Sequence, residues 1–96
     1  MFFIQLKLIG EMNQVQAHMA AHKQWIKESI DAGIILCVGN LTATKGGGIL
    51  AHSLSLPEME EHLEKDPFVL HKLVTVDIVE FTPAQAHEKL SWFVEG

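Results

Sequence analysis

Hydrophobic and polar residues alternate in two stretches of this 96-residue chain, and such alternation is typical of half-buried strands. Residues 2–9 place aliphatic side chains on one face and a mixed set on the other: Ile4, Leu6 and Leu8 against Phe3, Gln5, Lys7 and Ile9. Residues 73–81 repeat the alternation. Residues 34–38 are continuously apolar, which predicts a strand buried on both faces. A further strand is expected from Ile49 to Ser53 or Leu54, after a long hairpin connection over residues 40–48.

A helical period runs over residues 15–32, between the first two strands. His22 falls within the apolar arc of this helix, whose other members are Val15, Met19, Ile26 and Ile30. The polar side chains are expected to point away from that arc: Gln16, Lys23, Gln24, Lys27, Glu28 and Asp31. Asn13 is expected to cap the start of the helix and Gly33 to end it.

Capping signals also mark the second half of the chain. Ser55 and Glu58 form a capping box, which predicts a helix running to about Glu64. Asp66 then caps a short helical turn, with Pro67 at its first position. Residues 82–83, Thr-Pro, are expected to open a C-terminal helix that ends near residue 91. The apolar residues 92–94 must then pack on the domain or on a second chain.

The order strand, helix, strand, strand, helix, strand is that of a ferredoxin-like α+β fold. It predicts one four-stranded antiparallel sheet with both main helices on one face. The other face also carries apolar side chains, which favours a homodimer in which two sheets pack together, with higher oligomers left open. We expect one domain over residues 1–96, with a core over 1–81 and a helical extension over 82–96.

Charge and composition narrow the classes of partner. The chain has twelve acidic residues, seven lysines and no arginine, for a net charge of −5. Proteins that bind nucleic acid need a basic surface, so this class is excluded, and a phosphorylated substrate is disfavoured without an arginine fork. No apolar run reaches the roughly 18 residues of a membrane span. The single cysteine, Cys37, indicates a cytoplasmic protein, and its apolar strand predicts a buried packing role.

His22 is the main candidate for chemistry, because a polar ring in an apolar stripe needs a hydrogen-bond partner. The best candidate partner is Asp66, 44 residues further along the chain. A histidine and a carboxylate in an apolar cleft are suited to proton transfer. Two structural alternatives stay open. In the first alternative, His22 is a core residue bonded to a backbone carbonyl. In the second, Asp66 acts only as a helix cap.

Three stretches of the sequence resemble the YCII-related proteins of the dimeric α/β-barrel superfamily: residues 21–26 with 31–33 after them, residues 37–41, and residues 55–69. The Asp-Pro-Phe of residues 66–68, combined with a histidine in the first helix, is the most specific part of the resemblance. The family usually has Gly-Pro where this chain has Gly39-Asn40. The resemblance extends from the first strand to about Phe81 and omits the last fifteen residues.

The resemblance implies that His22 and Asp66 form a polar pair in a cleft between the helices and the sheet. It also implies an enzyme, because one branch of the family resembles dehydrochlorinases that act on hydroxylated chloroaromatics. Relatives in the wider superfamily act on lactones, quinols and polyketides. An ionised Asp66 would orient the imidazole and stabilise its protonated form. Such a pair suits isomerisation, elimination or dehydrochlorination of a small hydroxylated aromatic or lactone-like substrate, and no cofactor is required.

Other side chains are candidates for contact with the substrate. Trp25 and Phe68 are placed to stack on an aromatic ring, although packing against neighbouring elements is the alternative for both. Gln5 and Lys7 would project into the space between paired sheets, either toward a ligand or into a polar layer of the interface.

The sequence also allows other interpretations of the metal site, the glycine triplet and the function. No metal site is expected, and the weak alternative is a zinc site built from His18, His22 and His62. The glycine triplet 46–48 is either a flexible hairpin tip or a mobile lid over the cleft. The main alternative to an enzyme is a non-catalytic sensor or binding module that holds its small ligand in the same cleft. A third interpretation is a structural or accessory dimer in which the pair of His22 and Asp66 is vestigial.

Overall fold

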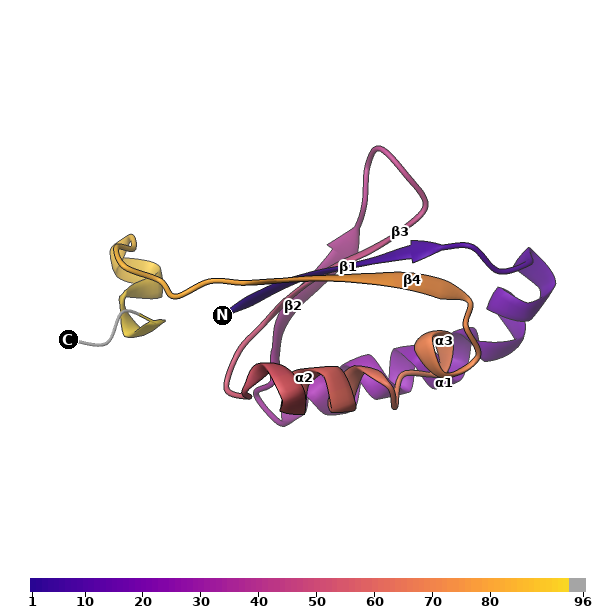
Figure 1. The fold of residues 1–96 in the computed structure, drawn as a ribbon, viewed down its shortest axis with the longest axis horizontal. Coiled ribbons are helices and arrows are strands. Elements are labelled where there is room, and N and C mark those ends of the chain that lie inside the picture. Colours follow the sequence, from indigo (N-terminus) through magenta and orange to yellow (C-terminus); the bar gives the residue numbers. More distant parts are fainter. Residues whose placement is uncertain (94–96) are drawn as a thin grey trace.

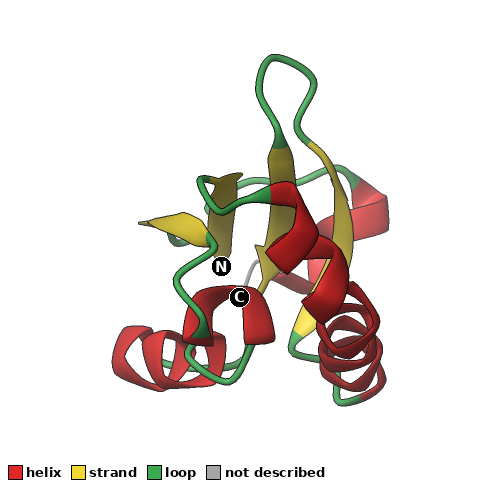
Figure 2. Cartoon of the chain, turned by 90° about the vertical axis from the view of Figure 1, so that its right-hand side faces the viewer, coloured by secondary structure: helices red, strands yellow, loops and turns green. Residues whose placement is uncertain are grey.

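The computed structural model describes residues 1–93. Its elements follow the order β1 (Phe2–Leu8), α1 (Met12–Asp31), β2 (Ile35–Asn40), β3 (Gly46–Ala51), α2 (Leu56–Leu63), α3 (Pro67–Leu70), β4 (Val74–Glu80) and the 3-10 helix η1 (Glu88–Phe93). The strands form one antiparallel sheet in the order β2-β3-β1-β4. Helices α1, α2 and α3 cover one face of that sheet (Figures 1 and 2). The predicted α+β fold with a ferredoxin-like arrangement is therefore confirmed.

The core lies between the sheet and the helix layer. In β1 the alternating residues Phe2, Ile4 and Leu6 are buried, as the sequence pattern predicts. Helices α1, α2 and α3 contribute further buried side chains to the same core: Val15, Trp25, Met59, Leu63 and Phe68. One continuous core thus fixes α1, α2 and α3 against the sheet.

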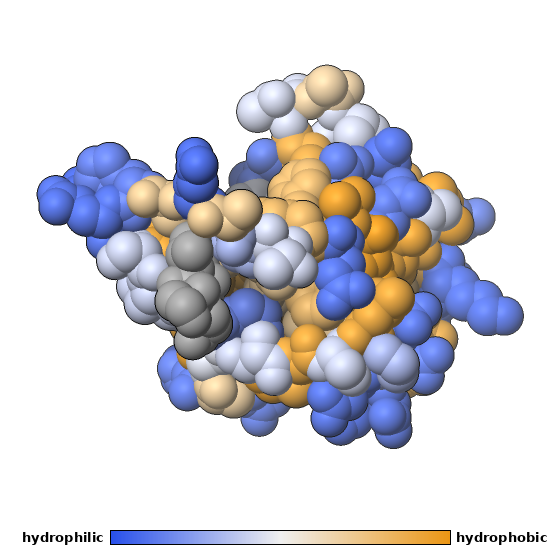
Figure 3. Space-filling model, turned by 60° about the vertical axis from the view of Figure 1, so that its left-hand side comes forward, coloured by the Kyte–Doolittle hydropathy of each residue, from blue (hydrophilic) through white to orange (hydrophobic). Residues whose placement is uncertain are grey.

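The face of the sheet opposite the helices carries an apolar row. Phe3 pairs with Val79 on one side and with Leu50 on the other, and Leu50 pairs with Cys37. Phe3 and Val79 are 39% and 55% exposed. Figure 3 shows apolar surface exposed between polar side chains on one side of the molecule. The sheet face that carries Phe3 and Val79, called the open face below, is the surface from which the sequence predicts a homodimer.

Strand β2 corrects one prediction. It is the edge strand of the sheet and most of its residues are exposed, so the expected burial on both faces is wrong. Cys37 is exposed as well, contrary to its predicted packing role. Two features explain the exposure of Cys37. The register of β2 is irregular between Ile35 and Cys37, and Cys37 belongs to the row of side chains on the open face.

Helix α1 begins earlier than predicted. It starts at Met12 with Glu11 at the N-cap position, and Asn13 lies inside the first turn, so Asn13 is not the cap. The physical reason is that Gln14 and Val15 already donate their backbone N–H groups to the Glu11 carbonyl. Gly33 ends the helix in a left-handed conformation, as predicted.

The buried stripe of α1 also differs from the predicted arc. Trp25 and Ser29 are buried, whereas Ile30 is 42% exposed. The stripe turns toward α2 near the end of α1, because His62 of α2 contacts both Trp25 and Ser29.

The glycine triplet belongs to strand β3 and is neither a hairpin tip nor a lid. Gly46 has a positive φ of 147°, and a Cβ there would collide with the Leu6 carbonyl, so only glycine fits. The connection over residues 41–45 projects away from the helix layer (Figures 1 and 2). The third strand is therefore shifted from the predicted 49–54 to 46–51.

The caps of α2 and α3 are confirmed. Ser55 and Glu58 form the full capping box, and Asp66 caps α3 with Pro67 at its first position. The hydrogen bond from the Ser55 backbone N–H, and after it the bond with the Ser55 hydroxyl, lowers the pKa of Glu58. Two short connected helices can thus form without long apolar stripes of their own.

The predicted C-terminal helix is wrong in extent. Residues 82–87 are not helical, and only the short 3-10 helix η1 follows. The exposed residues of this segment lack the packing that a short helix needs for stability. Trp92 contacts the ring of His52 edge-on, and Val94 of the predicted apolar tail lies outside the described residues. No helix in residues 1–93 has both the length and the apolar character needed to cross a bilayer.

Candidate functional site

A pocket of about 480 Å³ lies between the helix layer and the sheet. Its lining residues come from α1, α3 and all four strands: Leu6, Leu8, Met19, His22, Lys23, Ile26, Val38, Gly39, Asn40, Gly46, Gly47, Gly48, Ile49, Phe68 and Val74. The walls are mainly aliphatic. Among these lining residues only His22, Lys23 and Asn40 have polar side chains. An apolar pocket with a few polar groups is typical of a small-molecule site.

Gly47 lines the sheet side of the pocket and has no side chain to fill it. Gly47 pairs with Leu6 on one side and with Asn40 on the other, so all three belong to one row on the helix-facing side of the sheet. A Cβ at Gly47 would meet only the Gly39 carbonyl oxygen, at 3.4 Å. A Cβ at the neighbouring Gly48 would instead contact Phe3 and Leu41 at 3.6 Å. The missing side chain of Gly47 therefore leaves room in the pocket itself.

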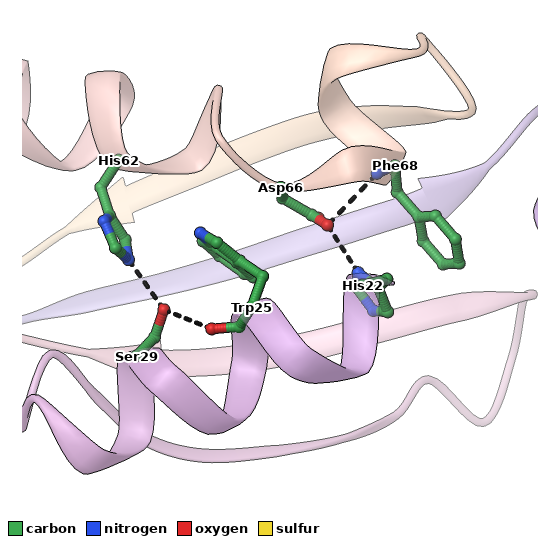
Figure 4. A network of polar contacts seen from close by, with 6 residues as sticks. All are labelled: His22, Trp25, Ser29, His62, Asp66 and Phe68. Atoms are coloured by element: carbon green, nitrogen blue, oxygen red, sulfur yellow. Dashed lines mark hydrogen bonds and ion pairs between the residues drawn. The ribbon is translucent and has the colours of Figure 1, made fainter. Parts of the chain in front are cut away.

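His22 and Asp66 meet as the sequence analysis predicts. His22 Nδ1 lies 2.6 Å from Asp66 Oδ1, and the side chains are 13% and 0% exposed (Figure 4). Helix α1 holds the histidine, and the N-cap of α3 holds the aspartate. Asp66 Oδ1 also accepts the backbone N–H of Phe68 at 3.2 Å. One carboxylate therefore caps a helix and binds the imidazole at the same time.

This contact decides which ring nitrogen faces a ligand. With Asp66 ionised, His22 Nδ1 donates its proton to the carboxylate. His22 Nε2 then carries the free lone pair of the neutral ring. Nε2 has no hydrogen-bond partner within residues 1–93, it is not buried, and His22 lines the pocket. The arrangement suits a general base that is oriented by a carboxylate.

Phe68 holds the imidazole from the side. The two rings stack at a centroid distance of 3.9 Å with an interplanar angle of 6° (Figure 4). Phe68 is buried, and its backbone N–H bonds to the same carboxylate oxygen as His22. The ring of His22 is therefore fixed both in its plane and along its hydrogen bond.

A second histidine contact bridges the helices nearby. Ser29 Oγ donates to the Trp25 carbonyl at 2.8 Å and lies 2.8 Å from His62 Nε2 (Figure 4). Because a hydroxyl has one proton, His62 Nε2 must carry the proton of the second bond. Burial of the ring, followed by the positive charge of Lys65, lowers the pKa of His62. Trp25 lies against His62 at 5.1 Å.

Two buried polar atoms have no hydrogen-bond partner in the described part of the chain, Asp66 Oδ2 and Trp25 Nε1. Unpaired buried groups are rare and costly in native proteins. The fold therefore retains an imperfectly satisfied carboxylate beside His22 and an imperfectly satisfied indole beside His62.

The other predicted site residues lie in different places, some at the pocket and some away from it. Phe68 lines the pocket, but Trp25 packs into the core between α1 and α2. Gln5 and Lys7 lie on the open face of the sheet and do not line the pocket. His18 stacks on His71 at 4.0 Å, so His18, His22 and His62 have separate partners. Across residues 1–93, no three histidine, cysteine or acidic side chains are grouped to hold a metal.

Sequence reasoning missed Lys23, Asn40 and Ser29. Lys23 is exposed, as expected of the polar side of the helix, and it also borders the pocket. Asn40 was expected in a loop and instead ends strand β2. Ser29 was detectable, because Val15, His22, Trp25 and Ser29 follow one another at intervals of seven, three and four residues, which is helical spacing.

Comparisons with known proteins support the fold. No family model matches the chain, and no curated protein matches its sequence. Among solved structures, the chain is similar to the 5-chloro-2-hydroxyhydroquinone dehydrochlorinase of Burkholderia phenoliruptrix, in complex with 2,5-dihydroxybenzoquinone. The TM-score is 0.67 at 16% sequence identity, over 84% of this chain and 93% of the other. At this identity the likeness shows a shared fold.

Proposed function

We propose that the protein is a small-molecule enzyme of the YCII-related type that uses His22 and Asp66 for proton transfer and requires no cofactor. The observation that carries the proposal is the 2.6 Å contact between His22 Nδ1 and Asp66 Oδ1, with Nε2 left open to an apolar pocket. The fold shared with a dehydrochlorinase supports it. The substrate class is a small hydroxylated aromatic or a lactone-like molecule.

The chemistry follows from the geometry. His22 Nε2 takes a proton from a hydroxyl or an acidic C–H group of the substrate, and Asp66 stabilises the resulting imidazolium. The electron pair left on the substrate forms a new double bond. In an elimination, the leaving group, such as chloride, departs with its own bonding pair. In an isomerisation, His22 returns the proton to another atom of the substrate.

The proposal includes a cytoplasmic homodimer formed through the open face of the sheet. The exposed apolar row of Phe3 and Val79 supports this, because monomeric proteins rarely leave such rows uncovered. Gln5 and Lys7 lie on the same face and would then be interface residues. Analytical ultracentrifugation measures the assembly directly, and a monomer at micromolar concentration would refute this part.

The first experiment is a turnover screen with chlorinated hydroquinones, unchlorinated phenols and lactones, comparing wild type with His22→Gln. Gln retains hydrogen-bonding groups but cannot exchange a proton near neutral pH. We expect turnover to fall by a factor of about 10² to 10⁴, with ligand binding retained. Loss of binding alone would instead support the sensor. Turnover equal to that of wild type would refute the catalytic role.

A matched pair of glycine variants tests whether the pocket is the site. Gly47→Val places a side chain in the pocket, and Gly48→Val places the same side chain on the opposite face of the sheet. We expect Gly47→Val to lower kcat/KM by about tenfold or more, because pockets discriminate strongly by volume. Equal effects of the two variants would mean that the substrate binds elsewhere.

A further inference from the structure

Lys23 occupies a distinctive place at the pocket. It follows His22 directly on α1, and its side chain borders the same pocket. Of the residues that line the pocket in the described chain, Lys23 alone is a lysine, aspartate or glutamate. Lys23 is therefore the one such charged side chain among the residues that line the pocket, while the Asp66 carboxylate lies behind the His22 ring, on its Nδ1 side.

No acidic side chain neutralises this lysine. The residues three and four positions away on α1 are Met19, Ala20, Ile26 and Lys27, and none is acidic. Lys27 is already paired with Asp31 at 3.2 Å. Throughout residues 1–93 Lys23 has no ion pair, although the chain carries an excess of five negative charges. Its charge is therefore available to a ligand.

Lys23 is exposed, and it borders the pocket beside apolar residues. Met19 and Ile26, on the same helix, are apolar, and Asn40 adds a neutral amide from strand β2. Attraction between an exposed lysine and an anion is screened by salt and is strongest at low ionic strength. The pocket thus combines a cationic group, an amide N–H donor and an oriented imidazole.

We propose that the pocket selects a small conjugated ring that carries an anionic oxygen, as a phenolate, enolate or carboxylate, and that Lys23 binds this oxygen. The inference rests on the proposed function, because it places the reacting group of the same ligand at His22. Lys23 then stabilises the negative charge that develops on the substrate oxygen when His22 removes a proton. Asn40 is positioned to donate a further hydrogen bond to the ligand.

Benzoate and benzamide test the proposal, since they share a shape and differ in charge. Their affinities are measured by NMR titration of wild type, Lys23→Met and Lys27→Met. Met keeps the length of the side chain, and Lys27 is an exposed control on the same helix. We expect wild type to prefer benzoate by about fivefold or more at low salt, with the preference reduced at high salt. Lys23→Met should abolish the preference, and Lys27→Met should retain it.

Three results would overturn the proposal: no preference in wild type, a preference that survives Lys23→Met, or equal loss of both probes in that variant. The last result would mean that Lys23 acts through packing. The proposed proton transfer is judged separately by the turnover of His22→Gln. A benzoate preference with unchanged turnover in His22→Gln would refute the catalytic role and leave the anion site standing.

Discussion

Two side-chain contacts link helix α1 to the neighbouring helices α2 and α3, and each contact contains a histidine. The two contacts differ in the hydrogen-bonding groups that they leave without a partner in the described chain. His22 on α1 binds Asp66, and His62 on α2 binds Ser29, which lies seven residues after His22. That separation is about two helical turns, so both bridges lie along one stripe of α1. One bridge borders the pocket, and the other joins the buried Ser29 to the half-buried His62 away from it.

The comparison teaches how to separate a functional histidine from a structural one. In the Ser29–His62 bridge, the hydroxyl proton goes to the Trp25 carbonyl and the ring donates to the hydroxyl oxygen. In the His22–Asp66 bridge, the partner is a fully buried carboxylate with one unpartnered oxygen in the described chain, and His22 lines the pocket, whereas His62 does not. A histidine that is held by a buried carboxylate at a pocket is a candidate for function, whereas a histidine bonded to a serine away from the pocket is a candidate for a structural role.

The largest expected effect on turnover is that of Asp66→Asn, which tests whether the His22–Asp66 bridge is functional rather than structural. The amide oxygen of Asn can still cap α3, so we expect the free energy of unfolding to stay within about 1 kcal/mol of wild type. Turnover should fall about 100-fold or more, because a neutral partner no longer stabilises the imidazolium. Urea denaturation and steady-state kinetics on one preparation measure both quantities.

Asp66→Ala provides the control for that variant. It removes the cap as well as the charge and should cost about 2–4 kcal/mol, because the Phe68 N–H and His22 Nδ1 both lose a partner. If Asp66→Asn keeps full turnover while Asp66→Ala unfolds, then Asp66 is a helix cap only.

A smaller effect is expected at the second bridge. Ser29→Ala leaves the ring nitrogen of His62 without its partner and should cost about 1–2 kcal/mol of stability. Turnover should stay within about twofold of wild type, because Ser29 does not line the pocket. Ser91→Ala is the matched control: it deletes an exposed serine bond to the Glu88 carbonyl and should be nearly neutral. A large fall in turnover with Ser29→Ala would make the two bridges one functional unit.

The smallest effect concerns pH. Burial lowers the pKa of His62 in the folded state, so between that value and the ordinary histidine value of about 6.5 the unfolded chain binds more protons. The stability contribution of neutral His62 is thus complete above the ordinary value and is lost as pH falls toward the lowered one. His62→Gln should show a flatter decline in stability than wild type between pH 7 and pH 5. Parallel curves for the two proteins would contradict this assignment.

Local patterns predicted much of the fold. The alternation of Phe2 to Leu8 indicated β1, and the capping box at Ser55 indicated the start of α2. The His22–Asp66 contact was also predictable, because a polar residue in an apolar stripe demands a partner. The resemblance carried by residues 66–68 pointed to the same aspartate. These features depend on the order and spacing of residues alone.

Other features required the packed structure. The apolar run around Cys37 looks buried, but the order of the strands places it at the edge of the sheet. Lys23 is solvent-facing, as its position predicts, but the position of α1 over the sheet also places it at the border of the pocket. Ser29 and His62 meet across 33 residues of chain. The sequence by itself therefore determined the elements, their caps and the demand of His22 for a partner, because periodicity and capping act within a few neighbouring residues. Only the tertiary structure decided which strand forms the edge, which polar groups surround the pocket and which histidine borders it, because these depend on strand register and on packing between distant elements.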